Sequence, residues 1–472
     1  MTDCCAVIHG CTVTAQNFLA HARVLGESFL RHNPGAAFSA LVVDDPPGAP
    51  EHPQAPFELL APSDIGIDRE ELHARGAMYS TQGLAGSMKP DLLLALLARG
   101  ADAVLLLDAD GRVYSELDNL GELAKTHLVV LSPHILDPHP LWVNDSPEQI
   151  IMRAGVMNAG LVAVGAGAEP FLAWWSQRTR RRCVFDEQSA LALGQTWLTM
   201  AVSLFEHHVL RDRGCNVAGW NLHGRDVEWV DEEPMIDGGP LRHFHFAGGF
   251  DPQCPSELTS MVGNRMWWAS LRERPGAQRL ARDYAQSLIS HGYRELRGRR
   301  SYYEFAPDGS RLEPWMRSAY RGELMRSELG ECARPPNPFT DGAQPFFQWL
   351  RETAAESAGL LESQEGPRSA TTGLGNFDER ELADALFDRS ELLGRIGELE
   401  AIRDESIAWA QRVSTELEQA RERLISADAR EDELSRLRAT MQSVWESPSW
   451  RLTRPLRAFK ELVRRPGGQA NG

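Results

Sequence analysis

The 472-residue sequence lacks the features that mark secreted and membrane-spanning chains. No charged start followed by an apolar segment opens it, and no stretch of about 18 apolar residues occurs. We therefore expect neither a secretory signal nor a membrane span. The seven cysteines are odd in number and are never spaced C-x₂-C, so we expect reduced thiols in a cytoplasmic protein, not disulfides or a zinc site.

Signals of several other function classes are absent as well. The formal net charge of −17 argues against nucleic acid as a partner, because a nucleic-acid binder shows a basic surface. The dinucleotide motif that Gly165 and Gly167 could begin is broken, since Pro170 stands where the third glycine is required. Neither a Gly-x-x-x-x-Gly-Lys phosphate loop nor a Gly-x-Ser-x-Gly elbow occurs. An anionic substrate would need a local binding site.

Short apolar segments alternate with helical patterns from Cys4 to about Phe250. This alternation predicts an α/β domain with a largely parallel sheet, which we place at residues 1–252. The expected helices lie at 18–29 and 88–97, and the expected strands lie at 5–11, 38–43, 104–107, 128–131 and 160–164.

After this domain the pattern becomes aromatic and helical, which predicts a helical extension at 253–353. Its apolar residues fit helical spacing, which favours core positions over a sugar-binding platform. They are Met266, Trp267, Trp268, Leu271, Leu280, Tyr284, Leu288 and Tyr293.

Three segments complete the expected organisation. A flexible linker at 354–377 is rich in Gly, Ser, Thr and Glu. Apolar residues at steps of three and four predict a coiled coil at 378–445 and hence a homo-oligomer, with a single solvated helix as the alternative. The basic amphipathic tail at 446–472 fits peripheral contact with an anionic membrane surface, or packing on its own coiled coil.

The most informative segment is 104–111, where an apolar run ends at Asp108 and Asp110. Four bulky apolar residues fit a strand buried on both faces, and ligand sites of such sheets form beyond the carboxyl ends of the strands. Carboxylate oxygens suit Mg²⁺ or Mn²⁺, whose coordination shells substrate phosphates often complete. The alternative is that the two aspartates only end the strand and turn the chain.

Four segments together resemble bacterial glycosyltransferases of the GT-A fold. The similar group contains glycogenin-like and lipopolysaccharide galactosyl- and glucosyltransferases, and the resemblance covers roughly residues 4 to 252. The segments are 7–31, the Lys89-Pro90 helix that runs into Asp108-Ala109-Asp110, the strand start at 158–161, and His-Phe-His-Phe-Ala-Gly-Gly at 243–249. The resemblance implies a Rossmann-like nucleotide-sugar domain of GT-A type.

The resemblance also implies that Asp108, Asp110 and His245 bind Mn²⁺ (or Mg²⁺) on the diphosphate of a nucleoside diphosphate sugar. A divalent ion stabilises a diphosphate leaving group, and an imidazole ligand shifts the preference toward Mn²⁺. His243 shares a strand face with His245 and competes for the role. The choice of His245 depends on the Phe-Ala-Gly that follows it.

Further site residues are assigned with this resemblance. Gly160 with Ala159 leaves room for a bound group near the backbone, and Lys89 either pairs with a carboxylate or the diphosphate or is an exposed helix charge. The assigned residues are Gln195 and Asn158 for catalysis, Lys89, Asn158, Gly160, Asn221 and His223 for substrate binding, and Gly10, Thr12, Asp44 and Asp108 for nucleotide binding.

Two departures from the similar enzymes affect this reading. Gly194 stands where the relatives carry an acid before Gln195, and Asp251-Pro252 stands where Lys-Pro often follows the late histidine segment. Donor phosphates would then depend on other cations, such as Arg153 or Arg242.

The sequence thus predicts a metal-dependent glycosyltransferase that acts at the cytoplasmic face and moves a sugar from a nucleoside diphosphate sugar to a cell-surface glycan or its lipid-linked carrier, with retention implied by the resemblance. We expect it in the cytoplasm or peripheral at the inner face of the membrane. The alternatives are a catalytically silent nucleotide-sugar-binding relative and a coiled-coil scaffold of an envelope glycan assembly complex. An intact cluster of like charges argues against both, because it is costly to keep.

Overall fold

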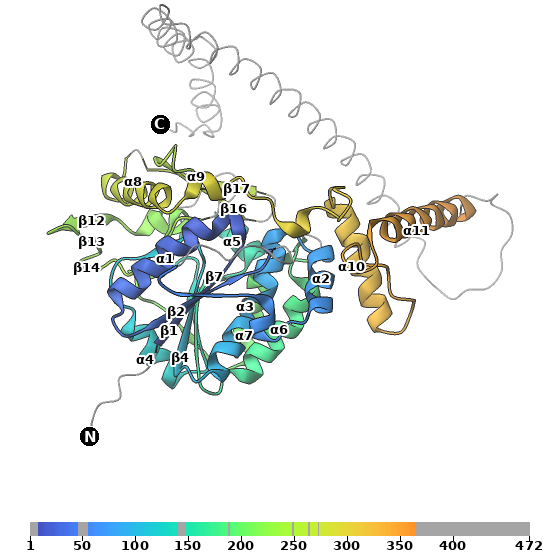
Figure 1. Ribbon diagram of the computed structural model, residues 1–472. Helices are drawn as coiled ribbons and strands as arrows, with labels where there is room; N and C mark the ends of the chain where they lie inside the picture. The colour runs from blue at the N-terminus through green and yellow to red at the C-terminus, as the bar shows by residue number, and fades with distance from the viewer. Residues whose placement is uncertain are drawn as a thin grey trace, which may run out of the picture. The chain divides into compact units, whose positions relative to one another are not determined.

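A mixed sheet lies between two layers of helices in the computed structural model of the protein (Figure 1). In the described part of the chain seven strands form it, in the order β10-β6-β7-β4-β1-β2-β3. Their bounds are β1 Ile8–Thr14, β2 Ala37–Val42, β3 Glu58–Leu60, β4 Ala103–Leu107, β6 Val129–Pro133, β7 Met157–Gly165 and β10 His208–Val209.

The structure describes residues 8–45, 55–139, 147–186, 189–247, 250–262, 265–271 and 273–364. Residues 1–366 make up one unit of the chain. The predicted coiled coil at 378–445 and the tail at 446–472 lie outside the described residues, as does the predicted linker from residue 365 onward.

Strand pairing confirms the predicted α/β class and adds one reversal. β1 pairs in parallel with β2 and β4, β2 with β3, and β6 with β10. β7 runs antiparallel to both of its neighbours, β4 and β6. The start of β7 therefore lies at the sheet edge where β4 and β6 end.

The residues of β4 explain why helices cover both faces of the sheet. Val104 and Leu106 belong to the core under α3 and α6, whereas Leu105 and Leu107 belong to the core under α1 and α4. All four side chains are fully buried, as the apolar run predicts for a central strand. The covering helices are α1 Leu19–His32, α3 Thr81–Ala98, α4 Asp118–Thr126 and α6 Glu169–Arg182.

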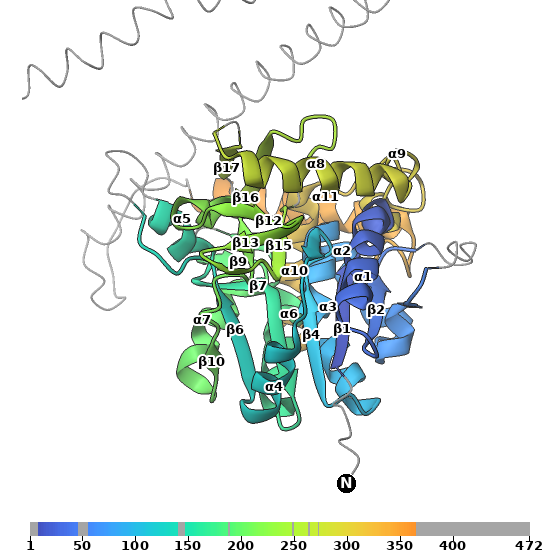
Figure 2. The ribbon, with the colours of Figure 1, turned by 90° about the vertical axis from the view of Figure 1, so that its left-hand side faces the viewer.

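Smaller elements gather at one end of the central strands, together with helix α8, Pro275–Ser290 (Figure 2). One three-stranded sheet joins β11 Val217–Ala218, β15 His243–His245 and β5 Gly111–Val113, in that order. The other short elements are β8 Phe185–Asp186, β9 Leu191–Ala192, β12 Val227–Val230, β13 Glu233–Ile236, β14 Gly239–Pro240, and the 3₁₀ helices η1 Gln16–Phe18, η2 Pro62–Ile65, η3 Gly219–Gly224 and η4 Tyr302–Glu304.

The remaining helices include those of the predicted extension. α8 carries Leu280, Tyr284 and Leu288 into a core shared with α1, so the helical spacing is confirmed there. α11 runs past residue 354, where the linker was expected to begin. The bounds are α2 Arg69–Met78, α5 Pro147–Ala154, α7 Gln195–Leu204, α8 Pro275–Ser290, α9 Tyr293–Leu296, α10 Pro314–Glu328 and α11 Ala343–Gln364.

The helical prediction is wrong for Met266, Trp267 and Trp268. They lie in strand β17, Arg265–Ser270, which pairs antiparallel with β16, Glu257–Val262. A short apolar run fits either period, and the adjacent strand partner decides in favour of β structure. The helix begins only at Pro275, a residue that suits the first helical turn.

Two further observations concern the cysteines and the helices of the described residues. Five of the seven cysteines, at 11, 183, 215, 254 and 332, are described and carry free thiols. None of the helices within the described ranges is long and apolar enough to cross a membrane.

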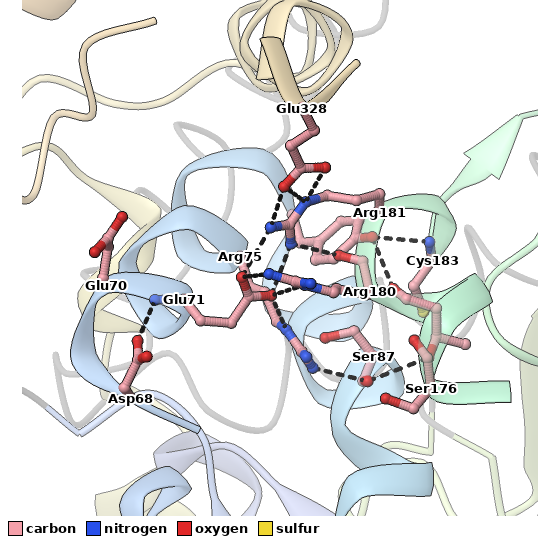
Figure 3. Close-up of polar contacts among 12 residues, drawn as sticks. Asp68, Glu70, Glu71, Arg75, Ser87, Ser176, Arg180, Arg181, Cys183 and Glu328 are labelled. Carbon is pink, nitrogen blue, oxygen red and sulfur yellow. Dashed lines mark hydrogen bonds and ion pairs between the residues drawn. The ribbon is translucent and has the colours of Figure 1, made fainter. Parts of the chain in front are cut away.

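A network of ion pairs joins four helices around Glu71 of α2 (Figure 3). The Glu71 carboxylate accepts hydrogen bonds from Arg75 at 2.8 Å, from Arg180 at 2.9 Å and from Arg181 at 2.7 Å. Arg181 of α6 also donates to Glu328 of α10 at 2.8 Å, and Arg75 donates to Asp91 of α3 at 2.8 Å. The network therefore ties α10 to the helices that cover the sheet.

Arg317 of α10 makes a second attachment, with backbone carbonyls as its partners. Its guanidinium donates to Gly76 O at 2.7 Å and Tyr79 O at 2.6 Å, at the end of α2. It also donates to Tyr303 O at 2.6 Å. A cation suits the carbonyl end of a helix, and here it also fixes the segment that precedes α10.

We expect Glu71→Gln to lower the free energy of unfolding by about 3 kcal/mol at neutral pH, because it leaves buried arginines without their charge partner. Burial raises the pKa of Glu71, but Arg181 and Arg180 outweigh burial and hold that pKa well below its ordinary value. The Glu71 contribution is therefore present above the unfolded-state pKa of about 4.3 and is lost as the pH falls through the folded-state value. Urea titrations of both proteins at several pH values measure the gap.

The control is Lys125→Gln, which breaks the exposed pair between Lys125 and Glu122. It should change the stability by less than about 1 kcal/mol. Equal effects of the two substitutions would contradict the role of the network.

Candidate metal centre

The site begins where β4 leaves the sheet. Asp108 N donates to Gly160 O at 3.0 Å, and Gly111 N donates to Asp108 O at 2.9 Å, which closes a turn. The chain continues directly into β5, which pairs antiparallel with β15 so that Gly111 faces His245. The aspartates thus turn the chain, as the alternative interpretation holds, and the same turn carries them to a histidine.

The structure brings Asp108, Asp110 and His245 together. His245 Nε2 lies 3.0 Å from Asp110 Oδ1 and 3.8 Å from Asp108 Oδ2. One possible ligand atom from each residue lies within 4.8 Å of the others. Ligand atoms on one divalent ion lie roughly 3–4 Å apart, so small side-chain shifts suffice to bind an ion. Within the described ranges no other group of three such residues lies this close.

Opposite charges attract Asp110 and His245 to each other. Burial opposes the charged form of Asp110, but His245 outweighs burial and lowers the pKa of Asp110 to about 2. Burial lowers the pKa of His245, and Asp110 more than reverses that shift, so the pKa of His245 is raised. Asp110 and His245 thus favour each other's charged forms, and a divalent ion bound here would compete with the proton of His245.

Lys89 of α3 supplies a second positive charge. Its Nζ donates to Asp108 Oδ1 at 2.5 Å and to Ala159 O at 3.0 Å. Of the roles considered for Lys89, pairing with a carboxylate is the one found, and the partner is the candidate ligand Asp108. The Asp108 side chain is 29% exposed, against 6% for His245, so the cluster opens to solvent at Asp108.

Two glycines leave the space that the cluster occupies. A Cβ on Gly160 would lie 2.6 Å from Asn158 Oδ1, 2.7 Å from His245 Cε1 and 2.8 Å from Asp108 Oδ2. These separations are far below ordinary carbon contacts, so any side chain at position 160 would displace the cluster. The room that Gly160 leaves is thus taken by side chains of the cluster, and its predicted contact with a bound group stays a prediction.

Gly111 plays the same part for His243. A Cβ on Gly111 would lie 2.3 Å from His243 Nε2. His243 is fully buried, and in the described part of the chain neither of its ring nitrogens has a hydrogen-bond partner. Burial lowers the pKa of His243 to about 3. Of the two histidines, His245 is therefore the one that meets the carboxylates.

Asn158 lies beside the cluster at the start of β7. Its Oδ1 accepts from Gly160 N at 2.9 Å, and its amide donates to His134 Nε2 at 2.9 Å. Burial lowers the pKa of His134 to about 4, so the neutral ring accepts that bond. His134 escaped the sequence analysis, although its position directly after β6, at the edge where β4 ends, is a signal that could have revealed it.

Asn221 and His223 hold the backbone rather than facing open space. Asn221 accepts from Ala218 N and donates to His134 O and Asn216 O, each at 2.9 Å. The ring of His223 stacks on that of His139 with centroids 3.5 Å apart. Asn221 could reach a substrate hydroxyl only by breaking these bonds, so the structure accounts for it as a positioning residue.

The residues assigned to the nucleotide differ in their surroundings. A Cβ on Gly10 would lie 2.6 Å from the Phe29 ring, so packing accounts for this glycine. Thr12 is fully buried, and its hydroxyl has no partner among the described residues. Asp44 follows β2 and accepts from Gln16 N at 2.8 Å. Burial raises the pKa of Asp44 to about 6.

Gly194 and Gln195 lie at the start of α7. The Gly194 carbonyl accepts from Trp175 Nε1 at 2.9 Å, and a Cβ on Gly194 would lie 3.3 Å from Thr179 Cγ2. The side chain of an acid at this position would therefore start in contact with α6. Gln195 is half-buried.

Of the two cations considered for donor phosphates, Arg242 is already engaged. It donates to Asp212 Oδ2 at 2.9 Å and to Glu116 O at 2.7 Å. Arg153 lies exposed on α5.

No protein-family model matches the chain. The uncharacterized protein YfnD of Bacillus subtilis (strain 168) is 25% identical over 171 residues, which are 34% of this chain and 52% of that protein. The match therefore spans about half the length of this curated relative.

Three glycosyltransferases are among the solved structures to which this chain is similar, each with a TM-score below 0.5. Galactosyltransferase LgtC, solved with donor and acceptor sugar analogs, is 15% identical, with 59% of this chain and 95% of that chain covered and a TM-score of 0.34. GlyE of Streptococcus pneumoniae TIGR4 is 14% identical, with 62% and 64% covered and a TM-score of 0.34. A glycosyltransferase involved in glycosylation of the major capsid of PBCV-1 is 11% identical, with 51% and 93% covered and a TM-score of 0.29.

We expect Gly160→Ala to weaken Mn²⁺ binding about tenfold or more, because the new methyl group overlaps atoms of Asp108 and His245. Calorimetric titration with MnCl₂ measures the affinity. The matched control is Gly322→Ala in α10, where a Cβ would meet nothing within 4 Å. Equal Mn²⁺ affinities of two folded variants would show that position 160 does not shape the cluster.

Proposed function

We propose that this protein is a divalent-metal-dependent glycosyltransferase that takes a sugar from a nucleoside diphosphate sugar. The observation that carries the proposal is the cluster of Asp108, Asp110 and His245, each candidate ligand atom within 4.8 Å of the others, at the carboxyl edge of an α/β sheet. Ligands of α/β sheets bind at this edge. The acceptor in this proposal is a cell-surface glycan or a lipid-linked carrier.

The donor set fits a divalent cation. Two carboxylates and one imidazole favour Mn²⁺ over Mg²⁺, because imidazole suits transition metals. When bound, such an ion would stabilise the negative charge that develops on the departing diphosphate. The partial exposure of the Asp108 side chain supports access of substrate oxygens to this position.

The residues around the cluster have separate parts in this proposal. Lys89 holds Asp108 and adds positive charge beside the donor diphosphate. Asn158, fixed by Gly160 and His134, orients the cluster edge that faces the transferred sugar. We assign Gln195 to contact with the same sugar. Retention of the anomeric configuration is also part of the proposal and follows from the resemblance in sequence.

A second candidate is a catalytically silent relative that binds a nucleotide sugar. Gly194 favours it, because the acid that precedes Gln195 in similar enzymes is absent here. Both candidates require metal-dependent nucleotide binding, and only the first requires sugar transfer. A screen of nucleotide sugars for Mn²⁺-dependent release of nucleoside diphosphate separates them.

We expect Asp110→Asn to leave folding intact and to remove Mn²⁺-dependent binding of nucleoside diphosphates. His245→Ala should weaken this binding more than His243→Ala, because only His245 contacts the carboxylates. Calorimetry with UDP, GDP, ADP and TDP, each with and without Mn²⁺, measures the effect. Unchanged affinity in Asp110→Asn would refute the metal site, and the reverse order of the histidine variants would reassign the ligand.

We also propose that residues 378–445 join chains into a homo-oligomer and that the tail at 446–472 contacts anionic lipid at the inner face of the membrane. A chain ending at Gly366, the last residue of the first unit, should be monomeric and keep metal-dependent nucleotide binding. It should no longer sediment with anionic vesicles, whereas the full chain should do so in a salt-sensitive manner, because linked weak contacts multiply. A full-length protein that is monomeric in light scattering and ignores such vesicles at low salt would contradict both assignments.

A further inference from the structure

A pocket of about 580 Å³ lies beside the ends of β1 and β2, outside the cluster described above. This volume falls within the range of about 300–1,000 Å³ that small-molecule sites occupy. Most of its wall comes from residues 299–309, beyond the segment that resembles known glycosyltransferases. The side chains that matter for its chemistry are Gln16, Arg299, Arg300, Ser301, Tyr302 and Phe305.

The pocket is connected to the carboxyl edge of the sheet through Asp44. Gln16 donates from its backbone to Asp44 Oδ1 at 2.8 Å and from its side chain to Asp44 O at 2.9 Å. Gln16, which lines one side of the pocket, therefore connects the pocket to the residues that follow β2.

The spacing of the strands places this pocket within the length of a nucleoside diphosphate from the cluster. β4, β1 and β2 are parallel neighbours in the sheet, so their carboxyl ends lie along one edge. Two strand spacings, roughly 10 Å, separate the ends of β4 and β2. A nucleoside diphosphate can bridge that distance, with its phosphates toward the cluster and its base away from it.

The two arginines are available for an anion. Arg299 and Arg300 are exposed, and across the described residues neither pairs with a carboxylate. The guanidinium of Arg300 lies over the Phe305 ring, 5.3 Å from its centroid, which holds it along the pocket wall. In a chain with a net charge of −17, such a local pair of free cations favours an anionic ligand.

The pocket wall is a preformed turn. Leu312 N donates to Glu304 O at 3.1 Å, Ala306 N donates to Ser310 O at 2.8 Å, and Arg317 fixes the carbonyl of Tyr303 at 2.6 Å. Tyr302 and Phe305 are half-buried and supply aromatic faces on which a nucleobase can stack. Little ordering would therefore be needed when a ligand binds.

The geometry points to this pocket as the site for the nucleoside diphosphate of the donor, with Arg299 and Arg300 binding its phosphates and the aromatic wall of Tyr302 and Phe305 receiving its base. This inference depends on the proposed glycosyltransferase function. In this inference the two arginines supply the positive charge for the donor phosphates that the Asp251-Pro252 segment lacks.

The test compares Arg299→Gln/Arg300→Gln with the matched double variant Arg282→Gln/Arg294→Gln, which removes two exposed arginines that do not line the pocket. Calorimetry measures binding of Mn²⁺ alone, of inorganic pyrophosphate with Mn²⁺, and of UDP, GDP, ADP and TDP with Mn²⁺. We expect the pocket variant to weaken pyrophosphate and nucleoside diphosphate binding about tenfold or more, with unchanged Mn²⁺ affinity. The control should bind all ligands as the unaltered protein does.

A second variant separates base from phosphate. Tyr302→Leu should weaken the nucleoside diphosphates and leave pyrophosphate unchanged. If the unaltered protein binds a nucleoside diphosphate and the arginine pair variant binds it equally well, the pocket assignment fails and the proposed function stands. If the unaltered protein binds none of the four with Mn²⁺, both fail.

Discussion

The antiparallel pairing of β5 with β15 is the contact on which the candidate centre depends. It places Gly111 opposite His245 directly after the turn that ends β4. Without this pairing, Asp108 and Asp110 would be two carboxylates at a strand end and nothing more. The absence of side chains at Gly111 and Gly160 lets the two histidines and the carboxylates lie as close as they do. The chemistry of the site is thus set by backbone register as much as by ligand type.

Buried charged side chains attach helix α10 to the helices that cover the sheet. Glu71 joins arginines from two helices, and Arg181 passes the connection to Glu328 of α10. Arg317, whose pKa burial lowers to about 10, has carbonyl oxygens as its partners instead. The ion pairs and the hydrogen bonds of Arg317 together fix α10 and the turn before it. This turn forms the wall of the arginine-lined pocket.

Sequence patterns predicted those features that depend on residues adjacent in the chain. The apolar run before Asp108 identified a strand buried on both faces, and its end identified the position of the carboxylates. Asn158 and His245 came from the resemblance in sequence, which also led to Gly10 and Asn221, whose surroundings in the structure are those of packing and of backbone support. The strand at Met266 was mistaken for a helix because a short apolar run fits either period, and its partner strand is needed to decide.

Other features could not be predicted from local patterns at all. The ion pairs of Glu71 connect residues far apart in the sequence, and no single segment signals them. The pocket beside Asp44 likewise joins Gln16 to residues near position 300, a juxtaposition that only the packing of α8 and α9 against α1 creates. Polar residues in such contacts look like ordinary surface charges until the fold is known.

The three candidate ligands come from two segments that are far apart along the chain, so only the folded protein can offer them to one ion. An ion that binds the folded state and not the unfolded chain adds to the free energy of unfolding in proportion to the logarithm of its concentration once the site is saturated. If the proposed metal site binds such an ion, the stability of this protein is linked to the concentration of divalent cations around it. Depletion of these cations would then remove the proposed donor-binding site and a part of the folding free energy at the same time.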